Sequence, residues 1–405
     1  MDSSATHRKM TGQFWTPEMP DTKISGHLSV SNDGSFLVEV EKAFSRDDCV
    51  IESAVYGILD NKKKISMHNP MYLSKMHGLG DISPSILSSS ILYLGDSYLV
   101  NKESLKGNSL KFVIQGLQSW FKDNNHPVNK NTQETTILKY SDFNIVFNHE
   151  SLDQAGTNNS ISTITSLIPA SLEELQVTLH RAITFLSFAT GRILLQEKTQ
   201  IVNQDGIWDI YYRPAFFSDK KQPVVTPLFI NGHENLQSRF NAWNKIYDDI
   251  LPLIVLYFLP QINDVDINTK YILKAQLIEA LHRKLERKNE VDYNLRVRNI
   301  VLRQKYKDLL FPPKSEESTN KICRNITDAR NYFTHYSRKA PPEAASATNL
   351  PFLTLKLQLV IDLYLLDKLG FDKKHFQAIN KTIIVDRFFR QKNVRRFLIR
   401  ERESK

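Results

Sequence analysis

The sequence contains very little cysteine. Only Cys49 and Cys323 occur among its 405 residues, and no CxxC or Cys/His pair has the spacing of metal ligands. A framework of disulfide bonds or a structural zinc site needs several such residues, so we expect neither. The chain also lacks GxGxxG, Walker, HExxH and GxSxG motifs, which argues against dinucleotide-binding proteins, NTPases, zinc proteases and α/β-hydrolases. We expect no metal and no cofactor.

Long hydrophobic runs are also missing. The longest run, residues 250–259, is interrupted by Pro252 and is too short to cross a bilayer. The first residues lack the apolar segment of a secretory signal peptide. We therefore expect a cytoplasmic protein that does not contact membranes.

Charge is distributed unevenly along the chain. Residues 1–240 contain 22 Lys/Arg and 25 Asp/Glu, a net charge of 22 − 25 = −3. Residues 241–405 contain 31 Lys/Arg and 19 Asp/Glu, a net charge of 31 − 19 = +12. A basic half beside a slightly acidic half indicates that the C-terminal part binds a polyanion. The alternative is a solvated basic surface without a partner.

Patterns of β-strands dominate the first half. Residues 26–30 and 35–41 flank Asn32-Asp33-Gly34, which is a hairpin pattern. Ser171 and Glu174 form a capping box that predicts the start of a helix. Further strands are expected at 53–59, 90–100, 109–114, 143–147, 192–195 and 208–212.

Helical patterns replace the strands after a proline-containing segment, residues 214–237. We expect helices at about 238–258, 267–288, 292–310, 318–339 and 350–369. The fold class is therefore α+β: a β-rich N-terminal domain over residues 1–237, followed by an all-α helical bundle over residues 238–405. The bundle ends in a basic segment.

The expected helix 318–339 has two distinct faces. Apolar residues repeat at the spacing of one helical face, namely Ile322, Ile326, Ala329, Phe333 and Tyr336. A second face consists of Arg324, Asp328, Asn331, His335 and Arg338. These side chains are suited to proton transfer and to phosphate contact.

Three residues of this helix are the candidates for catalysis. Asn331 and His335 are four residues apart, close enough for the amide to orient the imidazole. Arg330 lies about 140° around the helix from His335, so an ideal helix does not bring the two together. A long Arg side chain, or the same motif of a second subunit, must close that gap.

The sequence RNYFTH at residues 330–335 resembles the Arg-(x4–6)-His motif of HEPN domains, in which a polar residue often follows the Arg. The N-terminal half resembles that of ApeA-like anti-phage HEPN proteins, through Gly12-x-Phe14-Trp15-x-Pro17 and Gly26-x-Leu28. The resemblance implies a HEPN ribonuclease, with Arg330, Asn331 and His335 at its catalytic centre and a dimer that brings two motifs together.

A metal-independent mechanism fits these residue types. RNA supplies its own nucleophile, the 2′-hydroxyl group. His335 would remove that proton or protonate the leaving 5′-oxygen, and Arg330 would stabilise charge on the phosphoryl oxygens. Asn331 would fix the imidazole or the phosphate. The products would carry a 2′,3′-cyclic phosphate and a 5′-hydroxyl group.

Other basic residues are candidates for RNA binding. Arg324 and Arg338 share the helix with His335. The C-terminal segment interleaves phenylalanines with arginines, which favours stacking on unpaired bases, although its aromatics could instead pack on the bundle. Its candidate RNA contacts are Arg387, Arg390, Arg395 and Arg396.

Several other residues allow two readings. Glu279 and His282 could line the catalytic cleft or only support an amphipathic helix. The arginines of the preceding helical region could contact RNA or be solvated charge; they are Arg296, Arg298 and Arg303.

Two function hypotheses follow. In the first, the protein is a ribonuclease of anti-phage defence that acts by abortive infection on cellular or phage RNA (tRNA, rRNA or mRNA), with an unknown phage trigger at its N-terminal domain. In the second, it is a non-catalytic HEPN protein that binds RNA or serves as a scaffold. A toxin silenced by a nucleotidyltransferase usually has Arg-x4-His-x-Tyr, but here Tyr336 follows His335 directly.

Overall fold

The computed structural model describes residues 8–31, 35–44, 54–75, 84–100, 105–114, 117, 120, 135–148, 161–204, 206–212, 227–229, 235–262, 265–307, 316–335, 343–347 and 349–379. The chain forms two compact units. Unit 1 comprises Met1–Ser119, Pro127–His180 and Leu194–Ala215, and unit 2 comprises Trp120–His126, Arg181–Ile193 and Phe216–Lys405. The predicted division between residues 237 and 238 stays a prediction.

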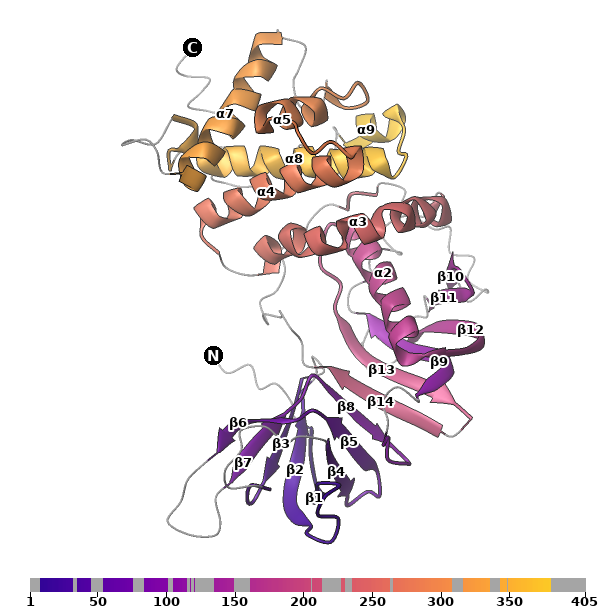
Figure 1. Cartoon of the computed structure of the whole chain (residues 1–405). Coiled ribbons are helices and arrows are strands. Elements are labelled where there is room, and N and C mark those ends of the chain that lie inside the picture. The colour runs from indigo at the N-terminus through magenta and orange to yellow at the C-terminus, as the bar shows by residue number, and fades with distance from the viewer. Residues whose placement is uncertain are drawn as a thin grey trace. The chain divides into compact units, whose positions relative to one another are not determined.

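Unit 1 contains one antiparallel sheet (Figure 1), whose described strands number 14. The strands are β1 (Arg8–Trp15), β2 (Ile24–Val30), β3 (Phe36–Val40), β4 (Ala54–Leu59), β5 (Lys64–His68), β6 (Met71–Lys75), β7 (Ser85–Ser88), β8 (Ile91–Gly95), β9 (Lys106–Ile114), β10 (Thr135–Tyr140), β11 (Phe143–Asn148), β12 (Ile161–Ser171), β13 (Gln196–Asn203) and β14 (Gly206–Tyr212). Their order across the sheet is β10-β11-β12-β9-β13-β14-β8-β5-β4-β1-β2-β3-β7-β6.

Strands β1–β8 enclose a core of alternating apolar residues. Phe14 of β1 is fully buried, whereas Gln13 beside it is exposed, as expected for a strand with one buried face. Val38, Val55 and Leu92 from three other strands belong to the same buried cluster. The predicted hairpin is confirmed, because β2 pairs with β3 from Gly26↔Val40 to Val30↔Phe36; its turn residues lie outside the described residues.

Two glycines allow close approach between strands. Gly12 and Gly26 lie opposite each other in the β1–β2 pair. A Cβ atom on Gly12 would lie 2.4 Å from the carbonyl oxygen of Ile58, and one on Gly26 would lie 2.3 Å from that of Glu39. Larger residues would therefore push β1 away from β4 and β2 away from β3.

Helix α2 (Leu172–Thr190) begins with the predicted capping box. The Ser171 backbone NH and hydroxyl group each donate to a Glu174 carboxylate oxygen at 2.8 Å, and the Glu174 NH donates to Ser171 Oγ at 3.2 Å. These contacts lower the pKa of Glu174 and satisfy groups that a helix N-terminus leaves unpaired.

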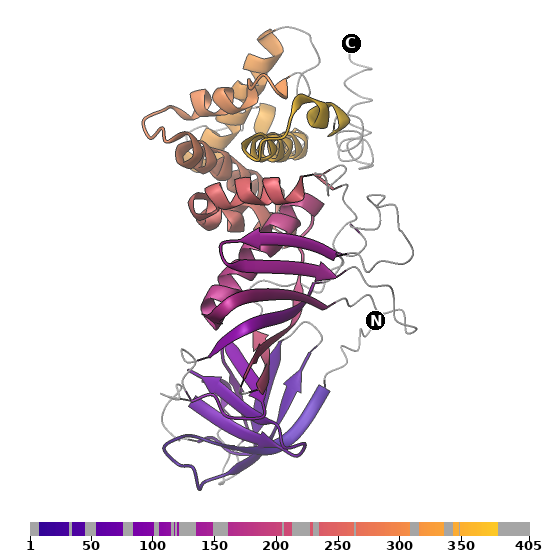
Figure 2. The ribbon, with the colours of Figure 1, turned by 90° about the vertical axis from the view of Figure 1, so that its right-hand side faces the viewer.

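Unit 2 is helical. It contains α3 (Leu236–Ile262), α4 (Ile267–Glu286), α5 (Tyr293–Val301), α7 (Glu316–His335), α8 (Leu350–Lys368) and α9 (Lys373–Ile379). Helix α4 packs between α3 and α8, and α7 packs on α5 and α4 (Figures 1 and 2). Most side chains of α8 are buried, so this helix forms the centre of the bundle.

Two prolines lie inside α3 without ending it. Pro252 and Pro260 are both within the helix, although proline normally removes one backbone hydrogen bond. Trp243, Tyr247 and Tyr257 of the same helix are buried. No helix among the described residues is long and apolar enough to cross a membrane.

The α+β fold class is confirmed, but some element predictions are wrong. The helix expected over 292–310 ends at Val301, where Leu302 forms its C-cap and a tight turn follows. The strand expected over 192–195 is irregular, and β13 starts at Gln196. Strand pairing depends on distant partners, which explains why short strands such as β6 and β7 were not predicted.

Candidate active site

Helix α7 carries the predicted motif on its C-terminal half. Its buried side consists of residues three or four apart, which are Cys323, Ile326, Ala329 and Phe333. Cys323 replaces the predicted Ile322, which is only half-buried, and Tyr336 lies outside the described residues. The position of this buried side determines which motif residues face outward.

Tyr271 of α4 fixes α7 in the bundle. Its hydroxyl group donates to the Ile326 carbonyl oxygen at 2.6 Å, and its ring centroid lies 6.0 Å from that of Phe333. Burial raises the pKa of Tyr271 well above its usual value, so the phenol stays protonated as a donor.

Arg330 is held by neighbours on three sides. Its Nη1 donates to Asn331 Oδ1 at 3.1 Å, and its Nη2 lies 3.3 Å from Glu279 Oε2 on α4. The guanidinium carbon also lies 5.1 Å from the centre of the Tyr293 ring on α5, a cation–π arrangement. The Arg330 side chain is 25% exposed. It is therefore anchored while still accessible to a phosphate.

Glu279 is a shared anchor. Its other carboxylate oxygen lies 3.0 Å from Arg283 Nη2, one turn along α4. Glu279 thus contacts Arg330 of the motif, in line with the interpretation of the sequence in which Glu279 lines the catalytic cleft.

Tyr293 is a neighbour of Arg330 that the sequence did not predict. Its hydroxyl oxygen is buried and has no hydrogen-bond partner among the described residues. Burial raises the pKa of this phenol far above its usual value. The ring of Tyr293 supports the Arg330 guanidinium, while its hydroxyl group is out of reach of solvent. Only the packing of α5 on α7 brings the ring there, so no local sequence signal could have revealed it.

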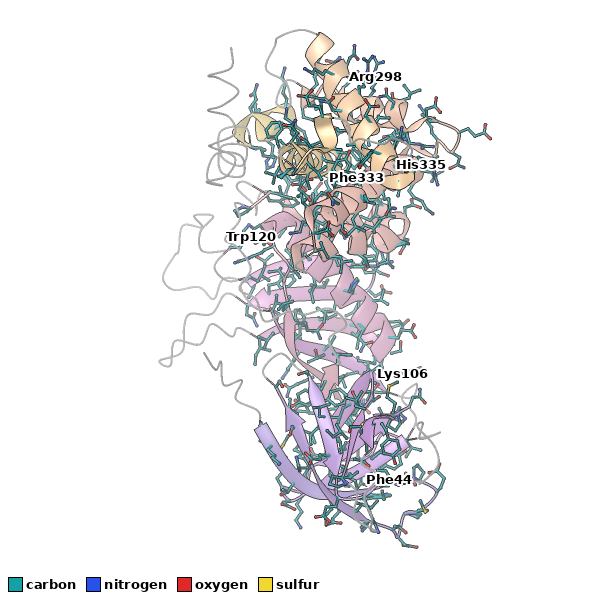
Figure 3. The ribbon with its side chains drawn as sticks, turned by 90° about the vertical axis from the view of Figure 1, so that its left-hand side faces the viewer. Phe44, Lys106, Trp120, Arg298, Phe333 and His335 are labelled. Atoms are coloured by element: carbon teal, nitrogen blue, oxygen red, sulfur yellow. The ribbon has the colours of Figure 1, made fainter. Side chains whose placement is uncertain are left out.

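His335 is the last residue of α7. Its side chain is exposed, whereas Phe333 two residues earlier is buried (Figure 3). Among the described residues the imidazole makes no hydrogen bond, and no contact joins it to Arg330. Asn331 lies one turn earlier, but its side-chain oxygen accepts from Arg330. One copy therefore presents the anchored guanidinium and the imidazole as separate groups.

Of the predicted RNA contacts, only Arg324 can be placed: it is exposed on α7. The other predicted contacts lie outside the described residues, namely Arg338, Arg387, Arg390, Arg395 and Arg396.

His282 does not reach the candidate site. It is 1% exposed, with Nδ1 lying 3.4 Å from Arg296 Nη1 and Nε2 lying 3.4 Å from Asn299 Nδ2. Burial and then the Arg296 cation lower the pKa of His282. It is a neutral structural residue, so the reading that places it in the cleft is wrong.

Two of the three arginines with two interpretations, Arg296 and Arg303, make contacts within the helical bundle. Arg296 is buried and donates to the carbonyl oxygens of Lys288 at 2.7 Å and Asn289 at 2.5 Å. Arg303 pairs with Glu286, and with Asp367 at 2.8 Å. For the buried Arg296, both interpretations, RNA contact and solvated charge, are wrong. Arg303 is ion-paired and 30% exposed, so it is not merely solvated charge, and its contact with RNA stays a prediction. Arg298 is half-buried (Figure 3).

The described residues contain no group of three or more His, Cys, Asp or Glu side chains arranged to hold a metal ion. The polar groups of the candidate site are those of acid–base chemistry and anion binding: the Arg330 guanidinium, the Asn331 amide and the exposed His335 imidazole. Such a set can bind a phosphodiester and move a proton.

Two family models match the chain. The model described as ApeA N-terminal domain 1 matches residues 9–230, more than half of the chain, and the model described as Apea-like HEPN matches residues 268–375. The second match includes Arg330, Asn331 and His335. No curated protein and no solved structure shows significant similarity to the chain. The chain therefore belongs to the ApeA family, which joins this N-terminal domain to a HEPN domain and is associated with anti-phage defence.

Proposed function

We propose that this protein is a metal-independent endoribonuclease that acts in abortive infection. The observation that carries the proposal is the anchored Arg330 guanidinium, five residues before the exposed His335 on the same helix, within a HEPN domain. HEPN domains often have ribonuclease activity, which makes RNA the substrate class. The basic character of residues 241–405 supports a polyanionic substrate.

The proposed reaction needs only the RNA and the protein. The 2′-oxygen attacks the adjacent phosphorus, and the bond from phosphorus to the 5′-oxygen breaks. One His335 accepts the 2′-hydroxyl proton, and a protonated His335 donates a proton to the 5′-oxygen. Arg330 binds the non-bridging oxygens, where charge develops. The products are a 2′,3′-cyclic phosphate and a 5′-hydroxyl group.

One imidazole cannot readily fill both roles in a single turnover. We therefore propose that two copies pair through their HEPN domains, so that each site receives a second His335. The separation of Arg330 from His335 within one copy is consistent with this arrangement. The N-terminal domain would respond to an unknown phage trigger.

The test compares the wild type with Arg330→Ala and His335→Ala at matched expression. Cellular RNA would be analysed on gels, and the fragment ends identified chemically. We expect each variant to reduce cleavage by about 100-fold or more and to abolish phage protection. Arg8→Ala and His180→Ala, exposed residues of unit 1, serve as matched controls.

Two outcomes would contradict the proposal. Equal phage protection by the wild type and both motif variants would favour the alternative, a non-catalytic protein that binds RNA or serves as a scaffold. Loss of cleavage on addition of EDTA would contradict the metal-independent mechanism.

A further inference from the structure

A cluster of half-buried aromatic rings lies on the outer face of the sheet in unit 1. Trp15 of β1 and Tyr56 of β4 are register partners across adjacent strands. Tyr98, which follows β8, bridges them: its ring centroid lies 5.6 Å from that of Trp15 and 5.5 Å from that of Tyr56. We call Trp15, Tyr56 and Tyr98 the aromatic platform. The catalytic proposal makes no use of it.

The platform is separate from the core beneath it. Phe14 and Val55, the chain neighbours of Trp15 and Tyr56, point to the opposite face and are fully buried. The three platform rings remain partly exposed. Removing one of them would not open a cavity in the core, so core packing does not account for three aromatic side chains gathered at this place.

The segment that carries Tyr98 is fixed by hydrogen bonds. The Leu99 NH donates to Ser66 Oγ at 2.8 Å, and the Leu99 carbonyl oxygen lies 2.9 Å from His68 Nε2. Leu99 itself is buried. Tyr98 is therefore held in place next to β4 and β5, and a ligand would find the platform already formed.

Two lysines accompany the rings. Lys23 Nζ lies 5.3 Å from the centre of the Trp15 ring, and Lys64 Nζ lies 5.2 Å from the centre of the Tyr98 ring. Among the described residues neither ammonium group forms an ion pair. Their long side chains can move from the ring faces to an anion, which leaves those faces open to another planar group.

A nucleotide has a planar base and an anionic phosphate. The platform rings can stack on the base, and the neighbouring lysines can contact the phosphate. Stacking on aromatic side chains and cationic contact with the backbone are the means by which proteins hold unpaired bases. Burial, and then the negative charge of Glu18, raise the pKa of Tyr56, so a carboxylate lies on the Tyr56 side of the platform. The phosphates would therefore follow the Lys23 and Lys64 side.

We propose that the aromatic platform binds unpaired nucleotides of a single-stranded nucleic acid. The N-terminal domain would thus contact nucleic acid independently of the catalytic motif. This inference does not rest on the proposed ribonuclease activity, because every residue that carries it lies in unit 1.

The test measures binding by the full chain carrying His335→Ala, so that RNA stays intact. The probes are fluorescent 12-nucleotide oligouridine and oligothymidine, a duplex of equal length, and uridine monophosphate. We expect Tyr98→Ala to weaken single-strand binding by about 10-fold. We expect Lys23→Ala/Lys64→Ala to do the same and to reduce the slope of log affinity against log salt by about 1.4.

Controls separate the platform from the other basic surfaces. Lys42→Ala/Lys106→Ala removes the same charge from two exposed lysines, one just after β3 and one on β9 (Lys106 is labelled in Figure 3), and should bind like the parent. The melting temperature of each variant reports folding, and a photocrosslink from 4-thiouridine should map to Trp15, Tyr56 or Tyr98.

Four results would overturn the proposal. The first is unchanged binding by the platform variants while they remain folded. The second is equal affinity for duplex and single strand, because bases in a duplex cannot stack on the protein. The third is binding of uridine monophosphate as tightly as the oligonucleotide, since the ligand would then be a free nucleotide and not a chain. A proline-rich peptide that binds the platform where oligonucleotides do not would also contradict it.

Discussion

Glu279→Gln offers a sharp test of the anchored arginine. The carboxylate of Glu279 lies 3.3 Å from Arg330 Nη2, and both side chains are about a quarter exposed. The amide keeps the size of the side chain but removes its charge. In the proposed reaction this change should lower both KM and kcat, so that RNA binds more tightly but is cleaved more slowly, which a general loss of folding would not do.

The magnitude follows from the ion pair. At an effective dielectric constant of ~20, opposite charges 4 Å apart attract by about 4 kcal/mol. Solvent screening and desolvation offset most of this at a partly exposed site, which leaves about 1 kcal/mol. Without the Glu279 charge, Arg330 should attract the RNA phosphate more strongly by that amount. We therefore expect KM to fall by about 5-fold, since 1.4 kcal/mol corresponds to about 10-fold.

The same substitution should lower kcat by about 10-fold, because misplacing a catalytic group by a fraction of an ångström costs rate. Arg330 would keep its contact with Asn331 and its position near Tyr293 but lose its ionic anchor on α4. Glu279 is thus a positioning residue in this reasoning.

Steady-state cleavage of a short RNA with a fluorophore and a quencher measures both constants. Arg283→Ala is the matched control, because it removes the other partner of Glu279 at a half-exposed position and leaves the contact between Glu279 and Arg330 in place. It should change kcat by less than about 2-fold. The reasoning is refuted if Glu279→Gln leaves kcat unchanged, or if KM rises together with a lower melting temperature.

Three further predictions concern buried polar groups of unit 2. Tyr293→Phe removes a buried hydroxyl group without a described partner, so thermal unfolding should show equal or higher stability, by up to about 1 kcal/mol. RNA cleavage should stay unchanged because the ring beside Arg330 remains; a clear loss of stability would contradict this reasoning. Asp362 is fully buried and accepts from the Tyr257 hydroxyl at 2.7 Å, so Asp362→Ala should cost about 3 kcal/mol in denaturant unfolding, and a loss below about 1 kcal/mol would argue against this contact. Burial and the Arg296 cation lower the pKa of His282, so as the pH falls this imidazole is protonated in the unfolded chain before it is in the folded one. The free energy of unfolding should therefore decline as the pH falls below about 6.5. His282→Gln should flatten that decline in thermal melts between pH 7 and 5, and an unchanged dependence of stability on pH would contradict the assignment.

Local features of the sequence accounted for much of the helical structure. Helical periodicity predicted α4 and α8 to within two residues at each end, and the Ser171–Glu174 pair marked the start of α2. These signals are local because helix hydrogen bonds and caps join residues close in the chain. The resemblance carried by Gly12 and Gly26 has a reason that is not local, since a side chain at either position would collide with a neighbouring strand.

The sequence by itself determined that Arg330, Asn331 and His335 lie on one amphipathic helix, and that the basic charge gathers in the helical half. Only the tertiary structure decided which partners those charges meet. Arg330 meets Glu279 from 51 residues earlier, while Arg296 is turned inward. The reason is physical: periodicity sets which face of a helix is buried, but ion pairs and stacking depend on which other helices the packed bundle brings against that face.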